Sequence, residues 1–161
     1  MQTRQATPDD ADAIAAIYNE GITDGVATFE TQPRTREDIL RWFGTPFPTV
    51  VVEDDGGVMA FASTSEYRPR ECYARIAEFS VYVGRAHRRK GAGKVAMEGL
   101  IAEACRAGFC KLVSRVFVEN EASRALVGRV GFREVGTYHR HGQLHGVWRD
   151  VVIVERLLPE V

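Results

Sequence analysis

The feature that most constrains the fold is a basic, glycine-containing loop that separates a strand pattern from a helix pattern. Strand-forming residues run to Val83, and helix periodicity begins after Gly93, with Gly91 two residues earlier. The first N–H groups of a helix lack intrahelical acceptors, and the helix dipole places positive potential there. Glycine lets the backbone approach a ligand, and three cations add charge: Arg88, Arg89 and Lys90. The segment therefore predicts a site for a phosphate or pyrophosphate group.

Two other phosphate-binding motifs do not fit this loop. A Walker A loop requires glycine where Arg88 stands, and serine or threonine where Val95 stands. A dinucleotide-binding GxGxxG motif requires a further glycine where Ala96 stands, and a place after the first strand of a βαβ unit. On this segment alone, a solvated basic turn that only caps a helix stays open as the alternative.

The rest of the chain alternates between strand and helix patterns. Strands are expected at residues 2–6, 49–53, 58–65, 75–83, 111–118, 132–138 and 147–157, and residues 21–33 are expected to be irregular. Four helices are expected: one begun by Thr7 and Pro8, one from Thr35 that Pro46 and Pro48 stop, one from Gly93 to Gly108, and one from Asn120 to Gly131. This interleaving predicts an α/β fold, a mixed sheet of seven strands flanked by four helices.

Composition limits the possible partners. The 161 residues are 45% apolar and 27% charged, with a net charge of -1, so a single soluble domain over residues 1–161 is expected. The charge balance does not indicate nucleic acid or an anionic membrane as a partner. No apolar run is long enough for a membrane span, and no signal-peptide pattern is found. Three cysteines, an odd number without a CxxC pair, favour the cytoplasm.

Two blocks resemble the GNAT superfamily of N-acetyltransferases. The run Arg88-Arg89-Lys90-Gly91-Ala92-Gly93 looks like the superfamily's pyrophosphate loop, Q/R-x-x-G-x-G/A. The run from Asn120 to Ser123, followed by Gly131-Phe132, resembles its later N-x-x-(A/S)…G-F segment, and the spacing between the blocks also fits. The resemblance implies a GNAT fold whose sheet splays between the fourth and fifth strands.

Further pieces are similar to one branch, which includes phosphinothricin, methionine sulfone and arsinothricin acetyltransferases. They are Ile17-Tyr18-Asn19, Thr28-Phe29-Glu30-Thr31-Gln32-Pro33, Glu78-Phe79-Ser80-Val81-Tyr82-Val83 and His145-Gly146-Val147-Trp148-Arg149-Asp150. The resemblance implies transfer of an acetyl group from acetyl-CoA to the α-amine of a small glutamate-like amino acid. That activity would confer resistance to a toxic amino-acid analogue.

The resemblance also assigns the cofactor site. The strand before the loop would hold the pantetheine arm by its backbone, the loop would wrap the pyrophosphate, and the next helix start would bond the pantetheine region. The implied residues are Val81, Tyr82, Val83, Arg88, Arg89, Lys90, Gly91, Ala92, Gly93, Lys94, Asn120 and Ser123. No resident metal is expected.

Glu78 is the candidate general base, because an amino acid's α-amine is largely protonated at neutral pH and must lose a proton before it attacks. Glu78 matches the branch's catalytic glutamate and lies just before the cofactor-binding backbone. Without the resemblance, a strand glutamate in a salt bridge is the alternative. Many GNAT enzymes carry a tyrosine where Val127 stands, so water or His145 is left to protonate the departing thiolate. The resemblance places His145 in the active site.

Substrate-side residues are expected upstream of Glu78 and in the first long loop. Arginine suits a carboxylate and a second acidic group, which favours a phosphinate or arsinate over a sulfone. The candidates are Phe29, Thr31, Arg70, Tyr73 and Arg75. Two arginines on a solvated loop are the alternative reading. The branch is generally dimeric, so a homodimer is expected.

Parts of the sequence also fit other functions. Three histidines, at 139, 141 and 145, together with Asp150, raise the alternative of a metal site, but a polar, partly solvated hairpin is the more common explanation of such a pattern. An acyl-CoA sensor without catalysis would keep the loop and lack Glu78. A protein or peptide N-acetyltransferase would need an open groove, whereas the arginines before Glu78 favour a small anionic substrate.

Overall fold

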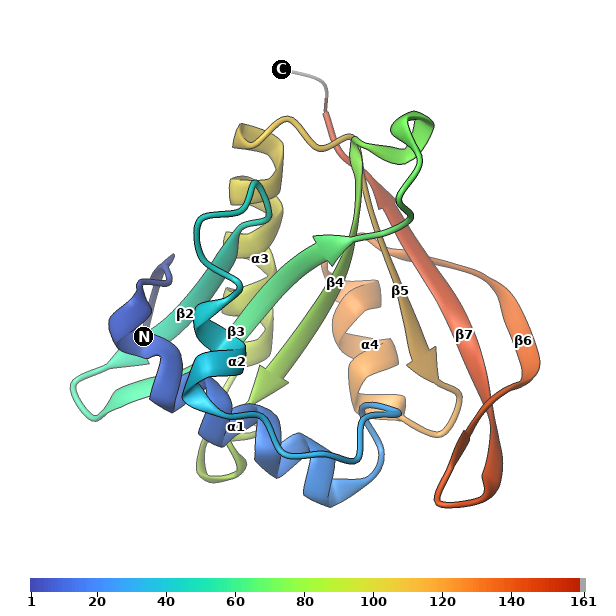
Figure 1. The fold of residues 1–161 in the computed structure, drawn as a ribbon, viewed down its shortest axis with the longest axis horizontal. Helices are drawn as coiled ribbons and strands as arrows, with labels where there is room; N and C mark the ends of the chain where they lie inside the picture. The colour runs from blue at the N-terminus through green and yellow to red at the C-terminus, as the bar shows by residue number, and fades with distance from the viewer. Residues whose placement is uncertain (160–161) are drawn as a thin grey trace.

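A seven-stranded sheet in the order β1-β2-β3-β4-β5-β7-β6 forms the centre of the computed structural model, which describes residues 1–159 (Figure 1). The strands are β1 (Gln2–Gln5), β2 (Thr49–Asp54), β3 (Gly57–Glu66), β4 (Ile76–Val83), β5 (Lys111–Phe117), β6 (Arg133–Leu144) and β7 (Val147–Leu157). The α-helices are α1 (Ala11–Asp24), α2 (Arg36–Leu40), α3 (Ala92–Arg106) and α4 (Glu121–Arg129). Short 3-10 helices are η1 (Pro8–Asp10), η2 (Glu71–Tyr73) and η3 (Arg85–His87). The predicted order of strands and helices is confirmed.

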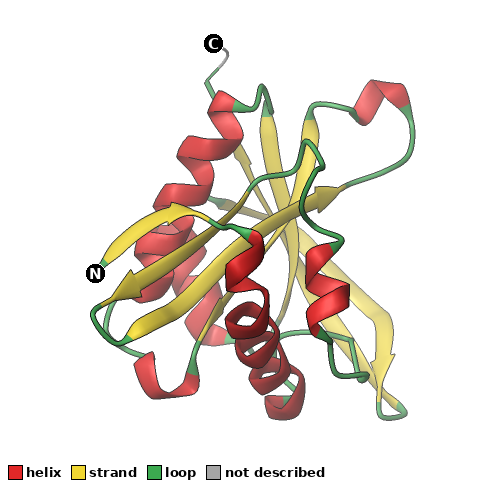
Figure 2. Ribbon diagram, turned by 60° about the vertical axis from the view of Figure 1, so that its left-hand side comes forward, coloured by secondary structure: helices red, strands yellow, loops and turns green. Residues whose placement is uncertain are grey.

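Helices cover both faces of the sheet (Figure 2). Because side chains alternate along a strand, Ala77 and Phe79 of β4 join a core with α3, whereas Tyr82 joins a core with α1. Ile14 and Ile39 are fully buried in the α1 core, and Met97 and Leu100 in the α3 core. Glu78 therefore lies on the face of β4 that Tyr82 and α1 share.

The first helix is longer than the sequence predicted. Residues 21–24, expected to be irregular, continue α1 to Asp24, and Gly25 ends it in the left-handed region at φ 69°. Gly21, expected to begin the irregular segment, lies inside the helix, and a Cβ there would lie 2.7 Å from the Tyr82 ring. Close packing against β4, rather than backbone freedom, therefore requires this glycine.

The second helix is shorter than predicted. It begins at Thr35 as expected, where the hydroxyl accepts from the Asp38 amide at 3.2 Å and the Asp38 carboxylate accepts from the Thr35 amide at 2.8 Å. It ends at Leu40, and Gly44 turns the chain at φ 76°, before Pro46 is reached. A turn, rather than the prolines, therefore ends the helix.

The C-terminal hairpin is also more regular than predicted. The histidine-rich stretch expected to be a connection belongs to β6, which runs to Leu144, and His145 and Gly146 alone form the turn at φ 51° and 78°. A register shift between Tyr138 and Gly142 absorbs extra residues. Leu144 anchors the end of the strand because it is 2% exposed against Phe117 and Val151.

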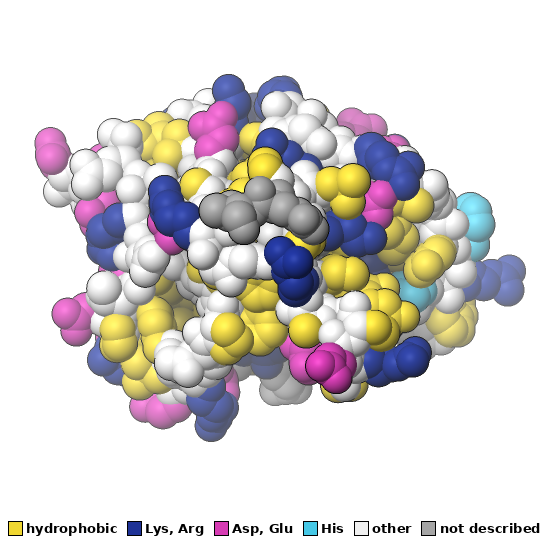
Figure 3. Space-filling view, turned by 90° about the horizontal axis from the view of Figure 1, so that it is seen from above, with side chains coloured by type: hydrophobic (Ala, Val, Ile, Leu, Met, Phe, Trp, Pro, Cys, Tyr) yellow, Lys and Arg dark blue, Asp and Glu magenta, His cyan; other side chains and the backbone are white. Residues whose placement is uncertain are grey.

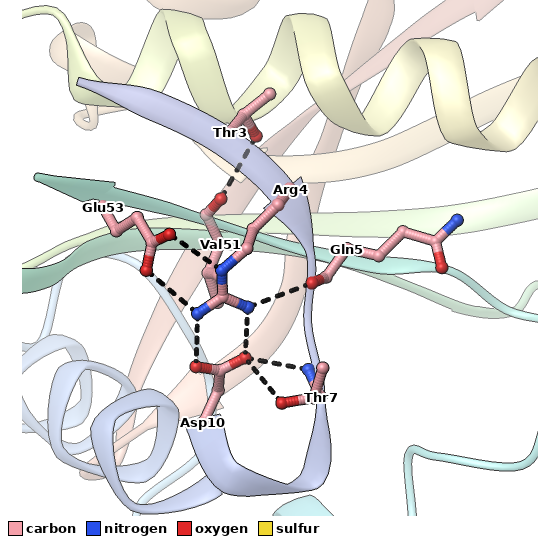
Figure 4. Close-up of polar contacts among 7 residues, drawn as sticks. All are labelled: Thr3, Arg4, Gln5, Thr7, Asp10, Val51 and Glu53. Carbon is pink, nitrogen blue, oxygen red and sulfur yellow. Dashed lines mark hydrogen bonds and ion pairs between the residues drawn. The ribbon is translucent and has the colours of Figure 1, made fainter.

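The N-terminal strand is held by one arginine (Figure 4). Arg4 donates to both carboxylate oxygens of Asp10 at 2.8 and 2.9 Å, and to both oxygens of Glu53 at 3.0 Å. This cluster joins β1, η1 and β2 on the edge of the sheet that lies away from β4 and β5.

The outer surface carries mixed charge. Seen from the end where β4 and β5 begin, basic and acidic side chains are interspersed rather than gathered into one field (Figure 3). Within residues 1–159, none of the helices combines the length and the apolar character that crossing a bilayer demands.

Candidate active site

β4 and β5 pair in parallel over a short stretch and then separate. Their backbones pair from Ile76–Lys111 to Glu78–Val113. Beyond that point β4 stays paired with β3 as far as Val83, and β5 stays paired with β7 (Figure 1). The splay predicted between the fourth and fifth strands is confirmed, and it leaves one side of the β4 backbone after Glu78 available to a ligand.

The gap opens into a groove. A cavity of about 60 Å³ between the diverging strands is lined by Ser80, Ser114 and Ser123, among others. It shares Asn120 and Ser123 with a groove of about 610 Å³ that runs along the end of β4, the phosphate loop and α4. An extended ligand can therefore pass from the loop to the point where the strands separate.

The groove collects most of the predicted cofactor residues from three separate segments. These are Val81, Tyr82, Val83, Arg88, Arg89, Gly91, Gly93, Lys94, Asn120 and Ser123. Lys90 is exposed in the same loop without lining the groove, and Ala92 is buried at 1% exposure. The contribution available from Ala92 is its backbone N–H at the start of α3.

The loop has the backbone geometry of an anion cradle. Arg89 and Gly91 adopt positive φ values of 63° and 85°, and Gly91 is the N-cap of α3. The first amide to bond back to Gly91 is that of Val95, at 3.2 Å, so the amides of residues 92–94 precede the hydrogen-bonding ladder. These N–H groups and the helix dipole fit the diphosphate of a CoA thioester.

Gly93 is required by packing as well as by the ligand. A Cβ at this position would lie 2.9 Å from Cδ2 of Leu126 and 3.4 Å from Cγ2 of Val83. The missing side chain therefore lets α3 approach α4 and β4 closely. This contact places the first turn of α3 beside the splayed strand.

The cations of the loop are not equivalent. Arg88 and Arg85 both bind Asp24 at the end of α1, at 2.6 and 2.8 Å. Hydrogen bonds from Arg88 and then Arg85 hold the pKa of Asp24 below its ordinary value. No ion-pair partner for Arg89 or Lys90 occurs within residues 1–159, so these two present uncompensated positive charge.

Tyr82 and Asn120 connect the groove to the first long loop. Burial raises the pKa of the Tyr82 phenol, which stacks on Tyr18 with ring centroids 4.9 Å apart, so the phenol stays neutral. The Asn120 side chain accepts from the Ser123 amide at 3.2 Å, as a helix cap, and donates to the Val26 carbonyl at 3.1 Å. The predicted cap at Asn120 is confirmed.

Glu78 lies at the last paired position before the splay. Its Oε1 accepts from Nη2 and Nε of Arg115 at 2.8 and 3.2 Å, and 26% of its side chain is exposed. The third guanidinium nitrogen of Arg115, Nη1, is 3.4 Å from Nε2 of His141. The ion pair that the sequence offered as an alternative for Glu78 is thus present, at the apex of the gap.

The three histidines of the hairpin have different surroundings. His139 pairs with Asp150 at 3.1 Å, His141 contacts Arg115, and His145 is exposed at the hairpin turn. Within residues 1–159, no group of three or more His, Cys, Asp or Glu side chains is arranged to hold a metal ion. His145 follows Leu144, which pairs with Val147 at the far end of the hairpin, so this chain does not bring it to Glu78.

The predicted substrate-side residues fall into two places. Arg70 and Tyr73 lie at η2 with the guanidinium 5.8 Å from the ring centroid, and Arg75 Nε donates to the Gly108 carbonyl at 3.0 Å. Phe29 packs edge-on against Phe117 of β5, with centroids 4.7 Å apart, and Thr31 is exposed in the same loop. The first group precedes β4, whereas Phe29 lies against the splayed half of the sheet.

Val127, which stands at the tyrosine position of many GNAT enzymes, is 2% exposed and lines the gap. An apolar side chain cannot donate a proton. The hydroxyl-bearing residues that line the same gap are Ser80, Tyr82, Ser114 and Ser123, and Ser114 Oγ already donates to the Phe79 carbonyl at 2.9 Å.

Sequence reasoning missed Arg115 and Asp24. Arg115 is the charged residue in the middle of an otherwise largely apolar strand pattern, which was a signal for a polar partner on the neighbouring strand. Asp24 fell in the segment expected to be irregular, so nothing indicated that it faces the loop.

A splayed parallel strand pair, a groove beside it and an anion cradle at the groove's end define an acyltransferase that draws on a CoA thioester. Residues 14–132 match the acetyltransferase (GNAT) family. The chain belongs to this family, and acetyl-CoA is its co-substrate.

Relatives match over nearly the whole chain. A phosphinothricin N-acetyltransferase of Alcaligenes faecalis is 32% identical over 96% of this chain and 81% of its own length. An L-methionine sulfoximine/L-methionine sulfone acetyltransferase of Pseudomonas aeruginosa is 32% identical over 94% of this chain and 91% of its own.

Solved structures agree with the fold. A phosphinothricin acetyltransferase from Sinorhizobium meliloti in complex with acetyl-CoA has a TM-score of 0.89 at 31% identity, covering 98% of this chain and 88% of its own. A ribosomal-protein-alanine N-acetyltransferase from Brucella melitensis has a TM-score of 0.92 at 32% identity, covering 98% and 100%.

Proposed function

We propose that the protein acetylates the α-amine of a small glutamate-like amino acid of the phosphinothricin, arsinothricin or methionine sulfoximine type. Such a reaction would confer resistance to a toxic amino-acid analogue. The observation that carries the proposal is the Glu78 carboxylate at the apex of the β4–β5 splay, next in sequence to Phe79 and Ser80, which line the gap between the strands. The names of full-length relatives support the substrate class.

In this proposal Glu78 is the general base. Its carboxylate lies at the last paired position of β4, directly before the backbone where the thioester carbonyl would lie. It would take a proton from the substrate ammonium, directly or through a water molecule, and leave a neutral amine to attack. Nη2 of Arg115 donates to the carboxylate at 2.8 Å, and this charge-assisted hydrogen bond orients it.

Backbone groups and solvent would complete the reaction. The β4 amides after Glu78, near Val81, lack β5 partners and are available to stabilise the tetrahedral oxyanion. Val127 cannot protonate the departing thiolate, so water or His145 would do so. Because His145 is exposed at a hairpin turn, we assign it to the neighbouring site of a homodimer.

We retain Arg70, Tyr73 and Arg75 as residues for the acidic groups of the substrate, with Phe29 and Thr31 on the opposite wall. Arg70→Ala and Arg75→Ala should raise the KM for phosphinothricin. Because Arg75 also bonds to the Gly108 carbonyl, the thermal midpoint must be measured beside the KM. A lower midpoint with an unchanged KM would assign Arg75 to folding alone.

The experiment that tests the function is a free-thiol release assay with acetyl-CoA and a panel of amino acids. The panel contains phosphinothricin, methionine sulfone, methionine sulfoximine and arsinothricin. Glu78→Gln should lower kcat by on the order of 10²-fold or more, whereas the Kd for acetyl-CoA changes by less than about twofold. The matched control is Glu134→Gln, which breaks another carboxylate–arginine pair, with Arg124. Wild-type kcat in Glu78→Gln would contradict the general-base role.

A second candidate is acetylation of a peptide N-terminus. The Brucella melitensis structure, named a ribosomal-protein-alanine N-acetyltransferase, favours it by similarity. The same thiol assay with alanine-terminated peptides separates the two functions. A kcat/KM for peptides above that for every amino acid of the panel would establish the second candidate.

We also propose a homodimer. β6 is one of the two edge strands of the sheet and is exposed along most of its length. Tyr138, Val147 and Trp148 of the hairpin are more than half exposed. Light scattering of the purified protein should give twice the monomer mass. A monomer mass over the assay concentrations would remove the proposed place of His145 in a partner's site.

A further inference from the structure

A side-chain bridge spans the apex of the splay on the α1 face of the sheet. Backbone pairing between β4 and β5 ends at Glu78–Val113. Arg115 is two residues beyond Val113, so its side chain leaves β5 on the same face as Glu78. It reaches back across the gap to the Glu78 carboxylate at 2.8 Å.

All three nitrogens of this guanidinium are engaged. Nε and Nη2 both donate to Oε1 of Glu78, at 3.2 and 2.8 Å, and Nη1 lies 3.4 Å from the His141 ring. Within residues 1–159, Oε2 of Glu78 has no hydrogen-bond partner. One carboxylate oxygen is therefore fixed, and the other is left for a proton from the substrate or from a water molecule.

The opposite face of the sheet carries a second link at the same level. Ser114 Oγ donates to the Phe79 carbonyl at 2.9 Å, again between β5 and β4. Ser114 and Arg115 of β5 thus contact Phe79 and Glu78 of β4, with one contact on each face of the sheet. Together they hold the apex where the backbone ladder ends.

The ion pair is poorly suited to stabilising the fold. With 48% of the Arg115 side chain and 26% of the Glu78 side chain exposed, solvent screens most of the attraction between the charges. A bond that adds little to stability, yet orients the proposed base, points to a role in catalysis. The bonds from Nε and Nη2 are both directed to Glu78, which favours orienting that carboxylate over binding the substrate's own.

We propose that Arg115 is a positioning residue, which holds Glu78 by Oε1 so that Oε2 faces the acceptor amine at the mouth of the splay. His141, behind the guanidinium, supports its orientation from β6. The inference rests on the proposed role of Glu78 as the general base. In this role Arg115 acts through Glu78 rather than on the substrate or the thioester directly.

The test is a double-mutant cycle between Glu78→Gln and Arg115→Gln, with kcat, the KM for each substrate and the Kd for acetyl-CoA measured in each variant. Arg115→Gln should lower kcat about tenfold and change the KM for the amino acid by less than about twofold. Arg115→Lys should recover part of the loss, because an ammonium can bond to Oε1 but cannot offer two parallel donors. The double variant should be no slower than Glu78→Gln alone.

Controls separate this inference from the proposed function. Arg133→Gln removes an exposed arginine that pairs with Glu155 on the same sheet, and should leave kcat unchanged. If Glu78→Gln keeps wild-type kcat, the general-base proposal fails first. The positioning role is wrong if kcat falls in Glu78→Gln but not in Arg115→Gln. It is also wrong if kcat of the double variant falls by the product of the two single losses. A rise in amino-acid KM alone would make Arg115 a substrate ligand and overturn the positioning role.

Discussion

Arg88 donates from Nη2 to Oδ2 of Asp24 at 2.6 Å, so one cation of the phosphate loop is already paired with a carboxylate of α1. Asp24 also lines the groove. A negative charge in the lining of a diphosphate site opposes the ligand, while the same carboxylate ties the loop to α1. The charge of Asp24 weakens ligand binding, whereas its bond to the loop favours it. The charge acts over the longer distance.

Asp24→Asn should therefore tighten CoA binding. Removing the charge should lower the Kd about two- to threefold at low ionic strength, and the gain should shrink as salt screens the site. Calorimetric titration with CoA at two salt concentrations measures it. Asp12→Asn, which removes the same charge from an exposed position of α1, should leave the Kd unchanged. Weaker binding in Asp24→Asn would show that its hold on the loop outweighs its charge.

Gly91→Ala tests the backbone of the cradle. Alanine at φ 85° costs about 1 kcal/mol, although a Cβ there would meet no atom within 4 Å. We expect a lower thermal midpoint and weaker CoA binding. Gly128→Ala is the matched control: a helical glycine with open space around it, which alanine should stabilise by about 0.5–1 kcal/mol. Equal midpoints for the two variants would contradict the strained geometry.

Gly142→Ala tests the wall formed by Phe29. A Cβ on residue 142 would lie 2.9 Å from the Phe29 ring, which packs on Phe117. Displacing the ring should raise the KM for the amino acid about two- to fivefold without changing the Kd for CoA. Gly136→Ala in the same strand, where a Cβ meets nothing within 4 Å, should change neither. An unaltered KM in Gly142→Ala would place Phe29 outside the acceptor site.

The Arg4 cluster makes stability depend on pH (Figure 4). Hydrogen bonds from Arg4 hold the pKa of Asp10 below its ordinary value, against the opposing effect of burial. Because the folded pKa is lowered, this stabilisation is complete above the unfolded pKa of about 3.9 and is lost as the pH falls through the folded value.

Asp10→Asn should lower the free energy of unfolding by about 1–2 kcal/mol at pH 7, and by less near pH 3. Urea denaturation at the two pH values measures the difference. The exposed Asp12→Asn serves again as the control and should lose little at either pH. A deficit that does not change with pH would mean that the carboxylate's shape, rather than its ionisation, stabilises the cluster.

The sequence by itself determined the order of the strands and helices and the location of the phosphate loop. These features depend on residues within about four positions of one another: the Thr35–Asp38 capping box, the Asn120 cap on Ser123 and the glycines that end helices. Local hydrogen bonds of this kind can be read from spacing alone.

Only the tertiary structure decided the partners of the charged residues. Glu78 and Arg115 are 37 positions apart, and Asp24 and Arg88 are 64 apart, so each pair is set by strand register and helix docking. Gly21 likewise falls in a segment expected to be irregular, and only the packing of the Tyr82 ring against it shows why glycine is needed there. The physical reason is that a contact between distant segments depends on how the sheet pairs and packs, which no local pattern of residues records.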